Sequence, residues 1–191
     1  MNNELLALLR TAKAEGWSKQ AFLEKASQIG GVYVPSFYKP VYNDDCTINH
    51  FDVHPGAPEK VTKRIIADMN SVHFPLSPIV PSTEVVHDRV NLELFRGCVR
   101  GCRFCQAGHV YRPIRAKSPE LLAEQGKALL KNTGCQDITL LSLSSSDYRC
   151  LSELCDELLG YCEPRSIGLS LPSLRADNFS MDIMHLSLIH I

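Results

Sequence analysis

The first part of the chain alternates between short amphipathic stretches and breaks rich in glycine and proline. Leucines recur on one face of residues 2–15, and Gly16 ends that stretch, which predicts a short helix. Ser18 can cap a second helix over residues 18–29 because its hydroxyl can accept a hydrogen bond from a free helical N–H. The breaks in "GGVYVPSFYKP" then favour an irregular connection.

Residues 39–84 predict a hairpin, a helix and a linker in that order. "KPVYNDDCTINHFDV" suits a small hairpin that turns at residues 43–45. "APEKVTKRIIADMN", residues 57–70, predicts a third short helix. The three prolines of "FPLSPIVPSTE" predict an extended, solvent-exposed linker.

The second half of the chain alternates between strand-like and helical patterns. "EVVHDRVNLELF", "DITLLSLS" and "SIGLSLPSLR" have the apolar content of strands. Between the first two, "SPELLAEQGKALLKNTG" has the signals of a helix, with Ser118 as cap, Pro119 in the first turn and Gly134 at the exit. "DYRCLSELCDELLGYC" predicts a second helix between the last two strands. This order predicts an α/β fold built from parallel βαβ units.

The overall composition is that of an ordinary soluble protein. Of 191 residues, 45% are hydrophobic, and the formal net charge of −1 argues against a general nucleic-acid binder. No apolar run reaches the roughly 18 residues of a membrane span. Glu4 and Arg10 interrupt the N-terminal apolar stretch, which makes it a poor signal peptide. We therefore expect a cytoplasmic protein with no membrane partner.

Three of the eight cysteines, Cys98, Cys102 and Cys105, lie within eight positions, whereas the others are scattered. In a reducing compartment such a cluster favours metal binding or catalysis over a disulfide framework. Three kinds of site are compatible with it. His109 would complete a zinc site, although structural zinc usually joins two separated ligand pairs. A ferredoxin-type cluster needs four thiolates, and a four-iron cluster with one open iron needs three.

The motif Cys98-x3-Cys102-x-Phe104-Cys105 resembles the signature of the radical SAM superfamily. The resemblance implies that the three thiolates hold a [4Fe–4S] cluster, whose open iron binds the amino and carboxylate groups of S-adenosylmethionine. It also implies that Phe104 packs near the adenine and that a flavodoxin or ferredoxin supplies electrons. The substrate is not implied.

Longer strings, "GVYVPSFY" and "EVVHDRVNLELFRGCVRGCRFCQAGHVYRPIRAKSPE", resemble a narrower group, the uncharacterised cobalamin-binding-type radical SAM proteins. The implied fold is a partial (βα) TIM-like barrel of about three βα units, preceded by a small helical and hairpin region. Cobalamin would belong to the full-length protein, because we expect its domain to be absent here.

Glycines and arginines of the same loop suit an anionic cluster. Gly97 and Gly101 allow the backbone to turn tightly around the sulfurs. Five arginines supply positive charge that offsets the cluster and its ligand, namely Arg96, Arg100, Arg103, Arg112 and Arg115.

Further candidates for S-adenosylmethionine binding follow the second and third strands. By the resemblance, Ser144, Ser145, Ser146 and Asp147 occupy the position that contacts the amino group, where glycines and a glutamate are more usual. Alternatively, Ser146 or Asp147 caps the next helix. Ser173 and Arg175 follow the third strand, and Arg175 would meet either the ligand carboxylate or a surface carboxylate.

The remaining cysteines do not predict a second cluster. Cys150 and Cys155 are five residues apart, so a helix would place them about 140° apart around its axis.

We expect three regions: residues 1–82 upstream, residues 83–183 as the first half of the barrel, and residues 184–191 as a non-native tail. The chain is then a fragment truncated at both ends and inactive alone. The alternative function is a non-catalytic metal-binding module, holding zinc or an electron-transfer iron–sulfur cluster.

Overall fold

The computed structural model describes residues 1–178 and divides the chain into two compact units, Met1–Ile65 and Ile66–Ile191. The expected non-native tail, residues 184–191, lies outside the described residues, as does the end of the expected half-barrel. No helix in the described part of the chain is both long enough and apolar enough to cross a bilayer.

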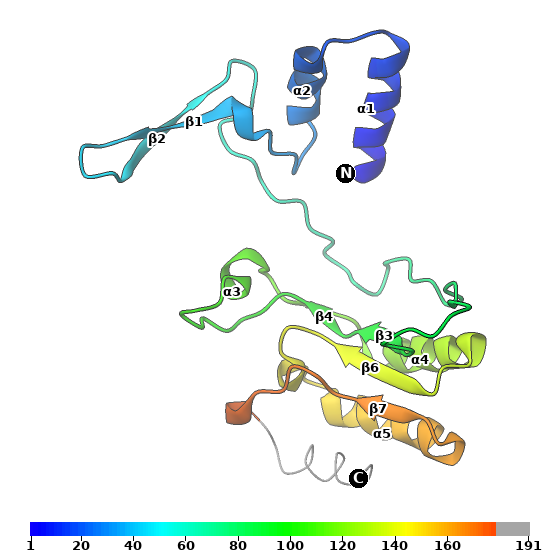
Figure 1. Cartoon of the computed structure of the whole chain (residues 1–191). Helices are drawn as coiled ribbons and strands as arrows, with labels where there is room; N and C mark the ends of the chain where they lie inside the picture. Colours follow the sequence, from blue (N-terminus) through cyan, green and yellow to red (C-terminus); the bar gives the residue numbers. More distant parts are fainter. Residues whose placement is uncertain (179–191) are drawn as a thin grey trace. The chain divides into compact units, whose positions relative to one another are not determined.

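The first unit contains two helices and a hairpin (Figure 1). Helix α1 spans Asn2–Ala14 and α2 spans Lys19–Ser27, with the Ser18 hydroxyl accepting a hydrogen bond from the Ala21 N–H at 3.2 Å. A 3-10 turn, η1 (Pro35–Phe37), leads into strands β1 (Tyr38–Tyr42) and β2 (Ile48–Val53), which pair antiparallel. The two predicted helices and the predicted hairpin are confirmed.

The helix predicted over residues 57–70 is wrong, because that segment has no helical or strand structure. Val61, Thr62, Ile65 and Ile66 are β-branched, which lowers helix propensity. Ile65 and Ile66 are 41% and 44% exposed, whereas Met69 near the end of the segment is buried, so the apolar side chains do not share one buried face. A short helix in water depends on such burial, and without it the segment forms no helix.

The second unit is built on a three-stranded parallel sheet. Strands β3 (Val90–Glu93), β6 (Asp137–Leu141) and β7 (Gly168–Ser170) lie in the order β3-β6-β7. Val90 aligns with Ile138, and Ile138 aligns with Leu169. Helix α4 (Pro119–Thr133) connects the first two strands and α5 (Leu151–Cys162) the last two. The predicted parallel βαβ units are therefore confirmed.

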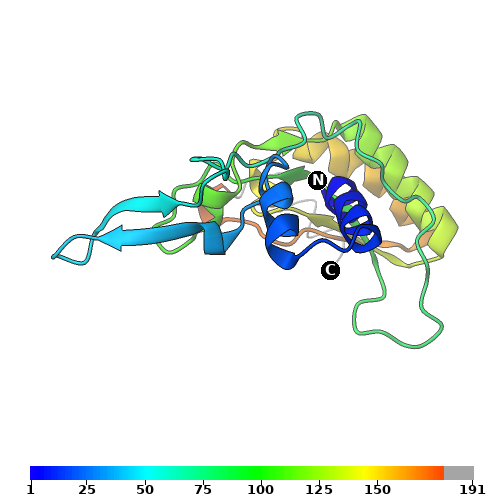
Figure 2. The same cartoon turned by 90° about the horizontal axis from the view of Figure 1, so that it is seen from above.

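Both connecting helices lie together on one side of the sheet (Figure 2). Helix α4 has the predicted ends: the Ser118 hydroxyl accepts a hydrogen bond from the Leu121 N–H, Pro119 is in the first turn, and Gly134 closes the helix with a φ of 73°. A glycine adopts this left-handed conformation without the steric cost that a side chain would add.

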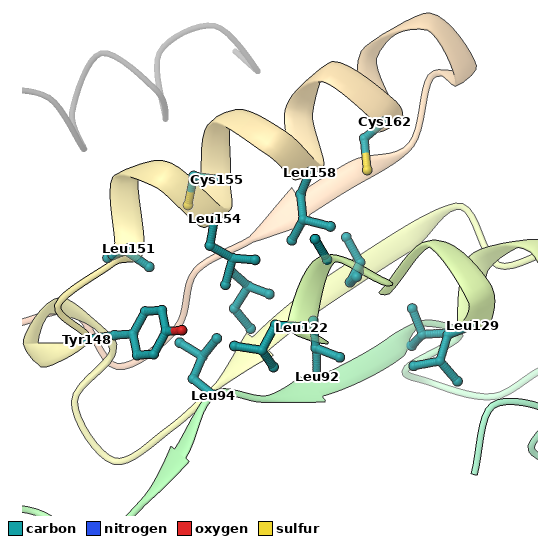
Figure 3. Close-up of a cluster of buried hydrophobic side chains, with 14 of the residues drawn as sticks. Leu92, Leu94, Leu122, Leu129, Tyr148, Leu151, Leu154, Cys155, Leu158 and Cys162 are labelled. Atoms are coloured by element: carbon teal, nitrogen blue, oxygen red, sulfur yellow. The ribbon is translucent and has the colours of Figure 1, made fainter. Parts of the chain in front are cut away.

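The core of this unit lies between the sheet and the two helices (Figure 3). Leu92 and Leu140 point into it from the strands, and Leu122, Leu154 and Leu158 pack onto them from the helices. Because successive strand residues point to opposite faces, Asn91, Glu93 and Leu141 lie on the face without helices. The fold is thus mixed α/β with a small parallel sheet, and residues 1–178 show no closed barrel.

Short elements complete the second unit. Strands β4 (Phe95–Arg96) and β5 (Arg115–Ala116) pair antiparallel, and the one-turn helix α3 (Ala107–Val110) lies between them in sequence. Three 3-10 turns follow, η2 (Ser145–Asp147), η3 (Glu163–Arg165) and η4 (Ala176–Asn178).

Candidate cysteine-loop site

The three clustered cysteines lie on the segment between β4 and β5, residues 97–114, called here the cysteine loop (Figure 1). The β4–β5 pair closes its base, and the Cys98 N–H donates to the Tyr111 carbonyl at 3.0 Å. The loop follows the carboxyl end of β3, which is the end of a parallel sheet where α/β proteins place their sites.

Two glycines permit the close backbone packing of this loop. Gly97 has a φ of 106°, and a Cβ there would lie 2.7 Å from the carbonyl oxygens of both Tyr111 and Pro113. A Cβ on Gly108 would lie 2.0 Å from the Arg100 carbonyl oxygen. Gly101, in contrast, has open space around it, so its predicted role in tight turning is not supported. The tight positions are Gly97 and Gly108.

All three thiols are free, with Cys98 buried and Cys102 and Cys105 half-buried. Among residues 1–178, however, no three side chains of His, Cys, Asp or Glu are grouped closely enough to hold a metal ion. His109 is exposed on α3. The donor set has the chemistry of a three-thiolate site, since cysteine thiolates are the usual ligands of iron–sulfur clusters. Binding such a group requires the thiols to move closer together than they lie here.

Arg100 of the cysteine loop forms a two-pronged ion pair with Asp147, in the turn after β6. The Arg100 Nε donates to one carboxylate oxygen at 2.9 Å, and Nη2 donates to the other. The Asp147 side chain is 10% exposed. The hydrogen bonds from Arg100 lower the pKa of the Asp147 carboxyl to about 2 from its ordinary value of 3.8. Charge-assisted pairs of this geometry are among the stronger polar contacts in proteins.

Arg175, which follows β7 in the chain, also contacts the cysteine loop, at Cys102. Its Nη1 donates to the Cys102 Sγ at 3.4 Å, while its Nε and Nη2 donate to the Asp177 carboxylate at 2.9 and 2.8 Å. These hydrogen bonds raise the pKa of Arg175, and the bonds to Asp177 have a larger effect than the bond to Cys102. Asn178 donates to the Ser146 carbonyl at 2.7 Å and to the Asp147 carboxylate at 3.0 Å.

The serines predicted to bind S-adenosylmethionine lie where these segments meet. The Ser145 N–H donates to the Ser173 carbonyl at 3.1 Å, and the Ser146 hydroxyl accepts from the Arg175 N–H at 3.3 Å. Ser144 is buried beside them. The structure thus brings together the cysteine loop, the turn at 144–147 and the segment 173–178.

These contacts bear on two of the alternatives left open by the sequence. Neither Ser146 nor Asp147 caps α5, because the cap position is Cys150 and it makes no side-chain hydrogen bond. Asp147 is instead held by Arg100, which lies 47 residues earlier. Arg175 does meet a nearby carboxylate, that of Asp177.

Other candidates remain apart from this junction. Phe104 is 94% exposed and packs on nothing. Cys155 and Cys162 are on α5 (Figure 3) and their side chains are buried, and burial raises the pKa of the Cys155 thiol to about 12. These two thiols therefore behave as small apolar side chains.

Sequence patterns did not indicate Asp177 and Asn178, which complete the polar junction. Both follow a strand by several residues, in a stretch with no motif of its own. The available signal was position alone, since the carboxyl ends of parallel strands lie at one edge of a sheet.

No protein-family model matches the chain. Over 98 residues, half of this chain, it is 35% identical to the uncharacterized protein MJ0966 of Methanocaldococcus jannaschii. That stretch spans 20% of the relative's length. The similarity supports a shared origin for this part of the two chains, and the name of the relative states no activity.

Proposed function

We propose that this chain is part of a radical SAM enzyme, in which Cys98, Cys102 and Cys105 hold a [4Fe–4S] cluster. The observation that carries the proposal is the convergence of Arg175 and the Ser144–Asp147 turn on the cysteine loop. These are the residues that the resemblance assigns to cluster and S-adenosylmethionine binding, and they come from three separate strand ends.

Held by Cys98, Cys102 and Cys105, a reduced cluster would supply the one electron needed to cleave the bond between sulfur and the 5′ carbon of S-adenosylmethionine, with methionine and a 5′-deoxyadenosyl radical as the products. A flavodoxin or ferredoxin would be the source of that electron.

The arginines of the junction would favour both the cluster and its ligand. Arg175 already donates to the Cys102 sulfur, and N–H donors to thiolate ligands raise the reduction potential of a cluster. Arg100 adds positive charge and fixes the loop to the turn after β6. The guanidinium of Arg175 already donates two hydrogen bonds to the Asp177 carboxylate. We therefore propose that Arg175 contacts the Cys102 sulfur rather than the carboxylate of S-adenosylmethionine.

The turn after β6 would contact the amino group of S-adenosylmethionine. Ser144, Ser145 and Ser146 offer hydroxyls there, and Ser173 lies beside them. Asp147 is committed to Arg100 and acts by positioning the loop. Phe104, fully exposed here, would cover the adenine only after the loop closes.

The finer fold proposal is a partial radical SAM barrel. It is supported by parallel strands in sequential order with both connecting helices on one face, the arrangement from which a TIM-like barrel is built. The activity of the whole protein, its use of cobalamin and a cytoplasmic location belong to this proposal as well.

Anaerobic reconstitution with iron and sulfide tests the ligand assignment. We expect about four iron and four sulfide per chain, and loss of both when Cys98, Cys102 or Cys105 is replaced by alanine. Cys150→Ala is the matched control, because Cys150 is half-buried and lies outside the loop. A colourless protein that binds zinc instead would support the alternative, a non-catalytic metal-binding module.

A further inference from the structure

A cavity of about 540 Å³ lies beside the base of the cysteine loop. Its walls are apolar at Phe95, Leu141 and Leu143, and polar or charged at Tyr111, Arg96 and Arg115. Its volume falls within the range of about 300 to 1,000 Å³ that is usual for small-molecule sites.

The cavity opens on the sheet face that carries no helices. Glu93 and Leu141 line it, and they alternate with Leu92 and Leu140, which point into the core beneath α4 and α5. The β4–β5 pair contributes Arg96 and Arg115, which lie opposite each other. The cavity therefore lies at the carboxyl end of β3 and β6, next to Gly97 at the start of the cysteine loop.

The cavity is separate from the junction assigned above to S-adenosylmethionine. None of Ser144–Asp147, Ser173 or Arg175 lines it. The cysteine loop is thus flanked by two different sets of residues. One comes from residues 144–147 and 173–175, and the other from β3, β4, β5 and residues 141–143 at the end of β6, where the Ser142 hydroxyl lies 3.0 Å from the Ser145 hydroxyl.

The charges of the cavity are unbalanced. Arg96 donates from Nε and Nη2 to the Glu93 carboxylate at 2.7 and 2.9 Å, so those two charges offset each other. Arg115 donates only to the carbonyl oxygens of Pro113 and Ile66, each at 3.2 Å. In the described part of the chain, Arg115 has no carboxylate within ion-pair distance. Arg115, a half-buried residue, leaves the cavity with one positive charge in excess.

We propose that this cavity binds an organic anion, a molecule with an apolar or aromatic body and one carboxylate or phosphate group. Arg115 meets the anionic group, and Phe95, Leu141 and Leu143 contact the body. We infer in addition that this ligand is the substrate of the radical reaction, and only that part of the inference rests on the proposed function. The binding site itself stands on the geometry and charge of the cavity.

The leucines give the apolar wall an accessible surface. Leu141 is the last residue of the central strand β6 and Leu143 follows it, and their side chains are 40% and 48% exposed. An apolar ligand that covers them removes this surface from water, which favours binding in proportion to the area covered.

The test uses 1-naphthoate and its neutral counterpart 1-naphthalenemethanol as probes, titrated into the whole chain without a cluster. Chemical shifts of the ¹³C-labelled leucine methyl groups report the site and the dissociation constants. We expect naphthoate to shift the Leu141 and Leu143 signals and to bind about tenfold more tightly than the alcohol, since a hydrogen-bonded charge pair has that effect on affinity.

Substitutions distinguish the contribution of the Arg115 charge to probe binding from the contribution of the cavity's shape. Arg115→Met should weaken naphthoate binding about tenfold with little effect on the alcohol, and Arg115→Lys should restore most of the loss. Arg10→Met removes an exposed arginine of the first unit and should change neither affinity. Leu143→Trp, at a half-exposed position that tolerates a larger side chain, should fill the cavity and abolish binding of both probes.

Equal binding of the acid and the alcohol would overturn the inference, as would affinities unaffected by both Arg115→Met and Leu143→Trp. Because the titration needs no iron, its result is independent of the proposed function. If reconstitution fails while the titration succeeds, the anion site stands and its ligand is no longer a radical substrate.

Discussion

Arg100 and Asp147, which are 47 residues apart in sequence, meet in a two-pronged ion pair that joins the cysteine loop to the turn after β6. Asn178 donates to the same carboxylate at 3.0 Å and brings in the segment after β7. One carboxylate therefore links the ends of all three parallel strands, and the position of the cysteine loop depends on it.

The first prediction concerns acid stability. The pKa of Asp147 is about 2 in the folded chain and near 3.8 when the group is free, so the ion pair stabilises the fold fully above about pH 5. That contribution is lost as the pH falls toward 2. Asp147→Asn should lower the urea concentration at which half of the protein is unfolded at pH 6. Between pH 5 and pH 3, that concentration should fall less in the variant than in the unmodified protein. An unchanged pH profile in the variant would contradict this role.

The second prediction separates two glycines of the same loop. Gly97→Ala places a Cβ against two carbonyl oxygens at a φ of 106°, so it should destabilise the fold by about 2 kcal/mol and reduce iron uptake. Gly101→Ala meets nothing within 4 Å and should leave both properties unchanged. Thermal unfolding and iron analysis of the two variants, measured in parallel, compare their stability and their iron content. Similar behaviour of the pair would mean that the backbone of the loop is not tightly constrained.

The third prediction concerns thiol reactivity. Cys155 is buried and the pKa of its thiol is raised to about 12, so iodoacetamide at pH 8 should not modify it in the folded chain. Exposed Cys46 should react within the same interval. Peptide mass spectrometry measures both sites at once, and addition of urea should make Cys155 reactive. Rapid native modification of Cys155 would mean that α5 opens readily.

The fourth prediction tests the core that supports the site. Leu158 is fully buried between α5, α4 and the sheet, so Leu158→Ala should destabilise the second unit by about 2 to 5 kcal/mol. Leu6→Ala, at an exposed position of α1, is the matched control and should have little effect. Denaturant unfolding of both variants gives the comparison, and equal stabilities would show that the core is not organised around α5.

Local patterns predicted the elements of the fold well where one face of an element is buried. Helix α4 has its cap at Ser118 and its exit at Gly134, and both signals act within a few residues of the chain. The stretch at 57–70 has a similar periodicity, yet no tertiary surface covers Ile65 and Ile66, and the pattern alone could not reveal that.

The sequence indicated most residues of the candidate site, although not Asp177, Asn178 or the close packing at Gly108, and it did not indicate the contacts between them. The spacing of Cys98, Cys102 and Cys105 singled out the loop, and the ends of the strands singled out Ser144–Asp147 and Arg175. The partner of each charged group was not predictable. Arg100 pairs with Asp147 and Arg175 with Asp177 because three turns meet at one sheet edge, and that depends on the register of β3, β6 and β7.

The measurement that tests the central proposal most directly is electron paramagnetic resonance of the reconstituted, reduced protein with and without S-adenosylmethionine. If three thiolates hold a four-iron cluster with one open iron, the reduced protein should give an iron–sulfur signal whose shape changes when S-adenosylmethionine saturates that iron. Arg175→Met should retain the signal and lower the reduction potential of the cluster, because it removes the N–H donor to the Cys102 sulfur. A signal unchanged at saturating S-adenosylmethionine, or no iron–sulfur signal at all, would contradict the assignment of this chain to a radical SAM enzyme.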